Sequence, residues 1–185
     1  MRLFYILPFG DMPKEIVDFV RKVIELRFNR VCDVLDCVDV PEGAYDIRRG
    51  QFLSTEFLRR LNELCPPNAY KILGLTFVDL FVPVLTFVFG QAQLGGRAAV
   101  VSMMRLRQEF YGLQANETLF LERLAKEVVH ELGHTHGLVH CSDRKCVMHF
   151  SNSIMEVDIK GDNFCRSCRR ILIGKYDEQD EDTHS

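Results

Sequence analysis

The sequence predicts an α/β fold in which helices pack on a largely parallel β-sheet. Short apolar stretches alternate along the chain with longer stretches whose apolar residues recur at helical spacing. This order of strand, helix, strand and helix implies right-handed crossovers, which place the strands parallel to one another. With 185 residues, of which 47% are hydrophobic, the chain is long enough to bury one core. We therefore expect a single domain.

The N-terminal half is predicted to contain two pairs of strand and helix. Its strands are apolar and aromatic, as expected of strands buried on both faces, and its helices repeat apolar residues at helical spacing. Proline, glycine and charged residues mark the loop between the pairs. In chain order we expect a strand at 2–7, a helix from Asp11 to Phe28, a strand at 30–40, a loop at 41–51 and a helix that Ser54 caps.

Three more stretches are predicted to complete the sheet. They are strands at residues 70–77, 85–90 and 98–104, with a turn at 91–96. Pro83 lies just before the second of them. Proline is tolerated mainly at the edge of a sheet, because its nitrogen cannot donate to the hydrogen-bond ladder. Residues 85–90 are therefore the predicted edge strand.

A long helix is predicted to follow Asn116, which is a favourable N-cap residue. At 100° per residue its apolar side chains share one side, and His130 and His134 project from the other. The apolar set is Phe120, Leu121, Leu124, Ala125, Val128, Val129 and Leu132. Charged residues on its polar face, expected to be solvated, are Arg123, Lys126 and Glu127. The helix should therefore pack on the sheet and present its histidines to a cleft.

Three histidines, a glutamate and a glycine follow one another at a spacing that suits a metal site. His130 and His134 are four residues apart, so on a helix both can reach one cation. Gly137 can adopt a positive φ and end the helix, which brings His140 round as a third ligand. Three protein ligands leave the fourth position of Zn²⁺ for water, as in catalytic zinc sites. Glu131 is then placed to take a proton from that water.

Four of the seven cysteines have the spacing of a second metal site. They are Cys141, Cys146, Cys165 and Cys168. Four thiolates close a tetrahedral Zn²⁺ without water, which makes the site structural. Because Cys141 directly follows His140, we expect the cysteine site to anchor the loop that delivers this histidine. Two alternatives stay open: His140 or His149 could complete a site with three cysteines, or the thiols could be free and buried.

The pattern HExxHxxGxxH resembles that of the metzincin clan of zinc metallopeptidases. The cysteines that follow it, arranged around Met148, resemble those of the archaemetzincins in particular, over residues 116–175. The resemblance implies zinc-dependent hydrolysis of peptide bonds in peptide or protein substrates, with two Zn²⁺ per chain, one catalytic and one structural. It implies that Met148 forms a methionine turn beneath the catalytic metal. Where some metzincin branches have a tyrosine shortly after this methionine, His149 and Phe150 stand here.

The resemblance also refines the expected fold. It implies an α/β (α+β, metzincin-like) domain with a mixed, mostly parallel twisted sheet, one antiparallel edge strand and an active-site helix. Edge-strand residues expected to pair with extended substrate are Leu85, Thr86, Phe87, Val88 and Phe89. We expect a single domain at 1–175, followed by an acidic, mobile tail at 176–185. Within the domain, residues 1–140 form the sheet and the active-site helix, and residues 141–175 form the cysteine and methionine-turn segment.

Composition argues against several other classes of function. A net charge of −3 gives no electrostatic footprint for nucleic acid or an anionic membrane, and no feature indicates an oligomeric state. The apolar run at 80–89 is about half the roughly 20 residues of a membrane span, and the N-terminus lacks a secretory signal. The odd number of cysteines favours a reduced, cytoplasmic protein. The alternative function is a metal-stabilised, catalytically silent binding module in which only the cysteine site is occupied.

Overall fold

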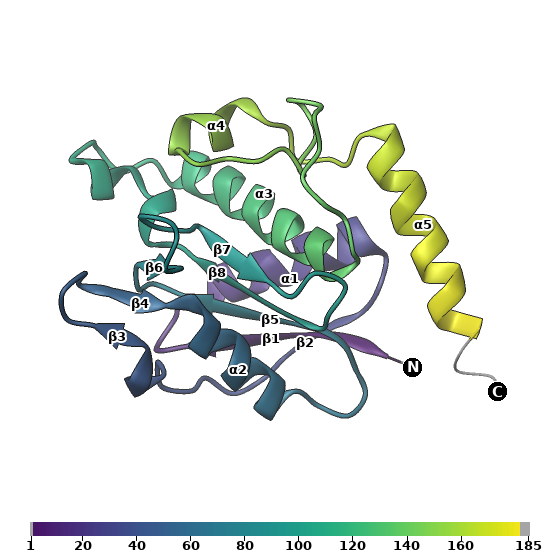
Figure 1. The fold of residues 1–185 in the computed structure, drawn as a ribbon, viewed down its shortest axis with the longest axis horizontal. Coiled ribbons are helices and arrows are strands. Elements are labelled where there is room, and N and C mark those ends of the chain that lie inside the picture. Colours follow the sequence, from purple (N-terminus) through teal and green to yellow (C-terminus); the bar gives the residue numbers. More distant parts are fainter. Residues whose placement is uncertain (1, 182–185) are drawn as a thin grey trace.

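A five-stranded sheet lies at the centre of the fold (Figure 1). The structure is a computed structural model that describes residues 2–181. The strand order is β2-β1-β5-β8-β7. These strands are β1 (Leu3–Phe9), β2 (Cys32–Val34), β5 (Ala69–Thr76), β7 (Gly90–Ala92) and β8 (Ala98–Ser102). All neighbours are parallel except β7, which runs antiparallel to β8 at the edge. The predicted mostly parallel sheet with one antiparallel edge strand is confirmed.

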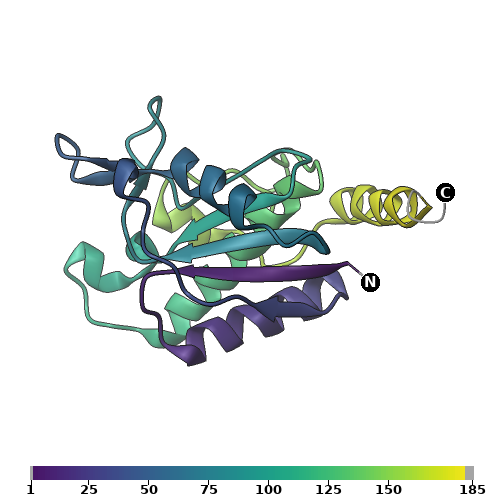
Figure 2. The same ribbon diagram turned by 90° about the horizontal axis from the view of Figure 1, so that it is seen from below.

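Helices cover both faces of this sheet. One face carries α1 (Lys14–Phe28) and α3 (Glu117–Thr135), and the other carries α2 (Ser54–Leu64). Figure 2 shows α1 and α2 on opposite sides of the strands. Most apolar residues predicted to face the sheet from α3 are fully buried, among them Leu124, Val128 and Leu132. Asn116 caps this helix as predicted, because its Oδ1 accepts the backbone N–H of Leu119 at 3.0 Å.

The edge strand lies later in the chain than predicted. Residues 85–89 form an irregular segment that follows a turn at 83–84 and makes one isolated β-bridge, from Val88 to Leu80; the strand begins at Gly90. Side chains satisfy carbonyls at the start of this segment, since Gln51 Nε2 donates to the Thr86 carbonyl at 3.0 Å. At its end, the Ser102 N–H of β8 donates to the Phe89 carbonyl at 2.8 Å. The predicted strand at 85–90 is therefore wrong in position, and the predicted turn at 91–96 is shorter.

A second, small sheet takes in part of the stretch predicted to be a loop at 41–51. It consists of β3 (Tyr45–Asp46), β4 (Gln51–Leu53) and β6 (Leu80–Phe81), preceded by the 3-10 turn η1 (Glu42–Ala44). The predicted strand at 30–40 is regular only over β2, after which one bridge joins Val38 to Phe9. Two further 3-10 turns, η2 (Met104–Leu106) and η3 (Gln108–Tyr111), lead from β8 to α3.

The C-terminal segment crosses α3 and then leaves the body of the fold. The short helix α4 (Ile154–Ile159) lies over α3, and α5 (Arg166–Glu181) extends to one side (Figure 1). Because α5 continues to Glu181, residues 176–181 of the predicted tail are helical, and 182–185 lie outside the described residues. The mobility of the tail and the domain boundaries stay predictions. None of the described helices is both long and apolar enough to cross a membrane.

Candidate metal centre and cleft

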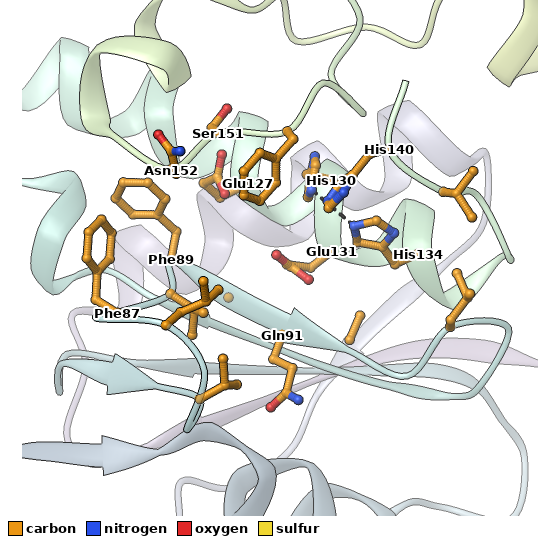
Figure 3. Close-up of a pocket in the computed structure, with 18 of the residues that line it drawn as sticks. Phe87, Phe89, Gln91, Glu127, His130, Glu131, His134, His140, Ser151 and Asn152 are labelled. Atoms are coloured by element: carbon orange, nitrogen blue, oxygen red, sulfur yellow. Dashed lines mark hydrogen bonds between the residues drawn. The ribbon is translucent and has the colours of Figure 1, made fainter. Parts of the chain in front are cut away.

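Three histidine side chains converge at the end of α3. The candidate ligand atoms of His130, His134 and His140 all lie within 4.8 Å of one another. The Nε2 atoms of His130 and His134 are 3.1 Å apart, and the His140 ring centroid lies 5.4 Å and 4.9 Å from theirs. Figure 3 shows the three rings gathered together with Glu131 beside them. The structure thus brings together all four side chains that the sequence placed in one site.

Backbone carbonyls fix the orientation of two of these rings. His130 Nδ1 lies 2.8 Å from the Val147 oxygen, and His134 Nδ1 lies 2.7 Å from the Leu138 oxygen. Because a carbonyl oxygen only accepts, each Nδ1 carries the proton and each Nε2 turns its lone pair to the shared site. Burial lowers the pKa of His130 well below its ordinary value and also lowers the pKa of His134. Both rings are therefore neutral at pH 7 and able to bind a cation.

The end of α3 turns the chain so that His140 returns to the other two histidines. Gly137 has a φ of +83°. Its N–H donates to the His134 carbonyl at 2.9 Å, and the N–H of Leu138 donates to the Gly133 carbonyl at 3.2 Å. This pair of bonds is a Schellman motif, which ends a helix at a glycine in the left-handed region. The role predicted for Gly137 in ending the helix is consistent with this geometry.

Glu131 lies between the histidines and the edge strand β7. The residue is 6% exposed, and burial raises the pKa of its carboxyl well above the ordinary value. The Glu127 carboxylate adds to this rise, and the Lys160 ammonium opposes it. Gly90 makes room for the side chain, since a Cβ there would lie 2.6 Å from both Glu131 Cγ and the Val100 oxygen. The raised pKa lets this carboxyl group hold a proton more readily than an exposed carboxylate does.

Two charged residues of α3 that we expected to be solvated are buried. Arg123 is 4% exposed and donates to both carboxylate oxygens of Asp158 at 2.7 Å. Glu127 is 3% exposed and lies 2.8 Å from Lys160 Nζ. The expectation is wrong for these two because α4 and the residue that ends it cover the polar face of α3. Lys126 stays half-buried and donates to the Val157 carbonyl at 3.0 Å.

The histidines and Glu131 open into a cleft of about 720 Å³. Val82, residues 85–89 and Leu94 line one wall with mostly apolar side chains, and Phe150, Ser151 and Asn152 line another. All five residues predicted to contact substrate border this cleft. They are Leu85, Thr86, Phe87, Val88 and Phe89. These residues therefore reach the site from an irregular rim, and not from the predicted strand.

Four cysteine sulfurs form a second cluster next to His140. They belong to Cys141, Cys146, Cys165 and Cys168 and lie within 4.8 Å of one another. The backbone N–H of Cys165 donates to Cys146 Sγ at 3.3 Å, directly before α5 begins. A hydrogen bond from the Cys168 backbone N–H lowers the pKa of Cys165, which favours its thiolate. His149 instead places Nδ1 3.0 Å from the Cys141 carbonyl oxygen, so the cluster consists of four cysteines.

Met148 is fully buried and lies against α3 at Gly133. A Cβ on Gly133, between the first two histidines of α3, would collide with Met148 Sδ. The thioether therefore packs directly on the helix backbone. His136 faces away from the cleft, as expected, and stacks on Phe28 with ring centroids 5.2 Å apart.

Comparison with known proteins identifies the family. Residues 10–173 match Peptidase family M54. The chain belongs to peptidase family M54. Relatives of this M54 member include an archaemetzincin of Methanocaldococcus jannaschii, which is 44% identical over 167 residues and matched over 90% of both chains.

Crystal structures of two archaemetzincins share the fold. The archaemetzincin of Methanopyrus kandleri matches with a TM-score of 0.85 and 41% identity, over 95% of this chain and 96% of that one. The archaemetzincin of Archaeoglobus fulgidus, complexed with malonate, matches with a TM-score of 0.80 and 39% identity, over 91% and 99%. The predicted archaemetzincin resemblance is confirmed, and this M54 member is a zinc metallopeptidase that acts on peptides or proteins.

Proposed function

We propose that this M54 peptidase hydrolyses peptide bonds with a zinc ion held by His130, His134 and His140 and with Glu131 as general base. The observation that carries the proposal is the position of Glu131 beside three converging imidazoles at one end of the cleft. Glu131 directly follows a candidate ligand on α3, so its carboxyl group shares the site without being needed to hold the metal.

The distances within both clusters suit zinc. At usual bond lengths, tetrahedral Zn²⁺ separates two nitrogen ligands by about 3.3 Å and two thiolates by about 3.8 Å. The Nε2 atoms of His130 and His134 are 3.1 Å apart, and the Cys141 and Cys165 sulfurs are 3.8 Å apart. We therefore propose two zinc ions per chain. The four-cysteine ion is structural, because four protein ligands leave no open position.

Glu131 performs the proton transfers of the proposed reaction. A zinc ion in the histidine site would lower the pKa of a bound water and polarise the scissile carbonyl. Glu131 accepts the proton of the attacking water and passes it to the nitrogen of the leaving amine. The raised pKa of Glu131 suits these two proton transfers, because the carboxyl group holds the proton between them.

We propose that substrate lies extended along the edge strand β7. This strand is the last of the five-stranded sheet and borders the cleft next to Glu131. A peptide could add to its outer edge by main-chain hydrogen bonds. The rim residues Leu85, Thr86, Phe87, Val88 and Phe89 would then contact substrate side chains. Since the rim is largely apolar, we expect a preference for apolar residues near the cleaved bond.

Replacing Gly90 by alanine should displace Glu131 and lower activity. The new Cβ would lie 2.6 Å from the Val100 carbonyl oxygen, which belongs to the central sheet and cannot retreat, so the edge strand must shift. We expect at least a tenfold loss of kcat/KM with unchanged zinc content, measured on one peptide. Gly43→Ala is the matched control, because a Cβ there meets nothing within 4 Å. Equal activity of both variants would show that the contact does not position Glu131.

Zinc content and peptide cleavage together test the proposal. Freshly purified protein should contain two zinc ions per chain and should cleave members of a peptide library. Chelation that empties the histidine site should abolish cleavage, and added zinc should restore it. One zinc per chain, lost on removal of the cysteine ligands, together with no cleavage would favour the catalytically silent binding module.

We also propose that the protein works in a reducing compartment such as the cytoplasm. All seven cysteines are free thiols in the structure, and thiols that hold zinc must stay reduced. That the protein binds neither nucleic acid nor membranes stays a prediction from its charge. Binding to DNA or RNA that falls steeply with added salt would contradict it.

A further inference from the structure

A buried ion pair that the proposed mechanism does not use lies beside the candidate ligand His130. Lys160 ends α4, and its side chain is 0% exposed. Its Nζ lies 2.8 Å from Glu127 Oε1, and the Glu127 side chain is 4% exposed. The same Nζ lies 3.4 Å from His130 Nδ1. Both charged residues border the cleft close to the proposed zinc site (Figure 3 labels Glu127).

This pair is not needed to hold α4 on α3. Arg123 already joins the two helices through two hydrogen bonds to Asp158, and Lys126 donates to carbonyls of the same segment. A buried ion pair is also a poor source of stability, because removing two charges from water offsets most of their attraction. An apolar pair of similar volume would pack α4 at least as well. The position of the charges therefore calls for another explanation.

Lys160 lies on the side of His130 that is turned away from the other histidines, and Glu127 is its ion-pair partner. His130 turns Nε2 toward the other histidines, and its Nδ1 side faces Lys160. A cation at this place repels a bound zinc ion through the ring, and an anion attracts it. Because burial weakens screening, each charge acts strongly on the site. Glu127 and Lys160 together leave the surroundings of His130 close to neutral.

We infer that Glu127 and Lys160 are positioning residues that set the zinc affinity of the histidine site by balancing opposite charges beside His130. This inference rests on the proposed zinc site. It assigns the two residues an effect on metal binding, and no contact with substrate. Its distinctive consequence is that removing either charge alone shifts zinc affinity, and that the two shifts have opposite signs.

Zinc competition with a chelator of known affinity tests the inference on the full chain. Glu127→Gln leaves the ammonium unbalanced and should weaken zinc binding at the histidine site by about 10- to 100-fold. Lys160→Met leaves the carboxylate unbalanced and should tighten it. The double variant should return to within a few-fold of the parent. Zinc at the four cysteines should stay bound in every variant.

Asp158→Asn is the matched control. It weakens the other ion pair between α3 and α4, so it should lower the unfolding temperature without changing zinc affinity. If Lys160→Met does not fold, the comparison of Glu127→Gln with the double variant still tests the inference. Only charge balance predicts that adding Lys160→Met to Glu127→Gln restores zinc affinity. Equal shifts in both single variants, no shift, or a double variant as weak as Glu127→Gln would overturn the inference. A parent protein without zinc at the histidines would instead overturn the proposed function.

Discussion

Replacing Glu131 by glutamine is expected to remove peptide hydrolysis while zinc content stays at the parent level. Glutamine keeps the shape of the side chain that packs against Gly90 but cannot accept the proton of the attacking water. General acid–base catalysis contributes about 10²- to 10⁴-fold, so kcat/KM on a cleaved peptide should fall by at least that range. Glu131→Ala should lose peptide hydrolysis to the same extent, although alanine no longer fills the space beside Gly90.

Glu122→Gln is the matched control for this prediction. Glu122 lies on the same helix and is exposed, so its substitution removes the same charge away from the cleft. Zinc content, the unfolding temperature and kcat/KM should all equal those of the parent. A Glu131→Gln protein that still cleaved peptides at the parent rate would exclude Glu131 as the general base and leave the fold and the metal sites unaffected.

The histidine site could be predicted from sequence because its geometry is local. Helical spacing places His130 and His134 on one face, and the turn at Gly137 returns His140 within a few residues. These contacts depend on the backbone of one helix and its end. The cysteine cluster was predicted for a related reason, since close pairs of cysteines need only one loop closure to meet.

The edge strand was misplaced because its partners are distant in sequence. Residues 85–89 have the apolar and β-branched composition of a strand, but Arg49 and Gln51 donate side-chain hydrogen bonds to the Leu85 and Thr86 carbonyls, 36 and 35 residues away. No local pattern shows these bonds. Once they form, the segment serves as the rim of the cleft, and pairing with β8 begins only at Gly90.

The buried charges on α3 were missed for the same reason. Arg123 and Glu127 occupy the polar face of the helix, and only the position of α4 shows that this face is covered. One signal was available: Glu127 precedes Glu131 by one helical turn, and two neighbouring carboxylates near a metal site call for a nearby cation. The sequence holds no comparable signal that Lys160 supplies it.

Replacing Cys165 by serine is expected to weaken zinc binding at the histidine site as well as at the cysteine site. Cys165 Sγ lies 3.8 Å from Cys141 Sγ, and Cys141 directly follows His140. Serine is a poor zinc ligand, so the cysteine cluster should lose its ion or hold it weakly. The loop from Gly137 to Cys141 then loses its anchor. In the variant, zinc binding at the histidines must order this loop and so costs conformational entropy, whereas in the parent folding has already ordered it.

We expect at least a tenfold loss of zinc affinity at the histidine site of Cys165→Ser, together with a lower unfolding temperature. Chelator competition resolves the two sites, because the parent should release histidine-bound zinc first. Cys37→Ser is the matched control, since Cys37 is an exposed free thiol outside the cluster. Its zinc content should not change. A Cys165→Ser protein with parent affinity at the histidines would contradict this coupling, because it would show that the Schellman turn at Gly137 alone suffices to hold His140 against the other two rings.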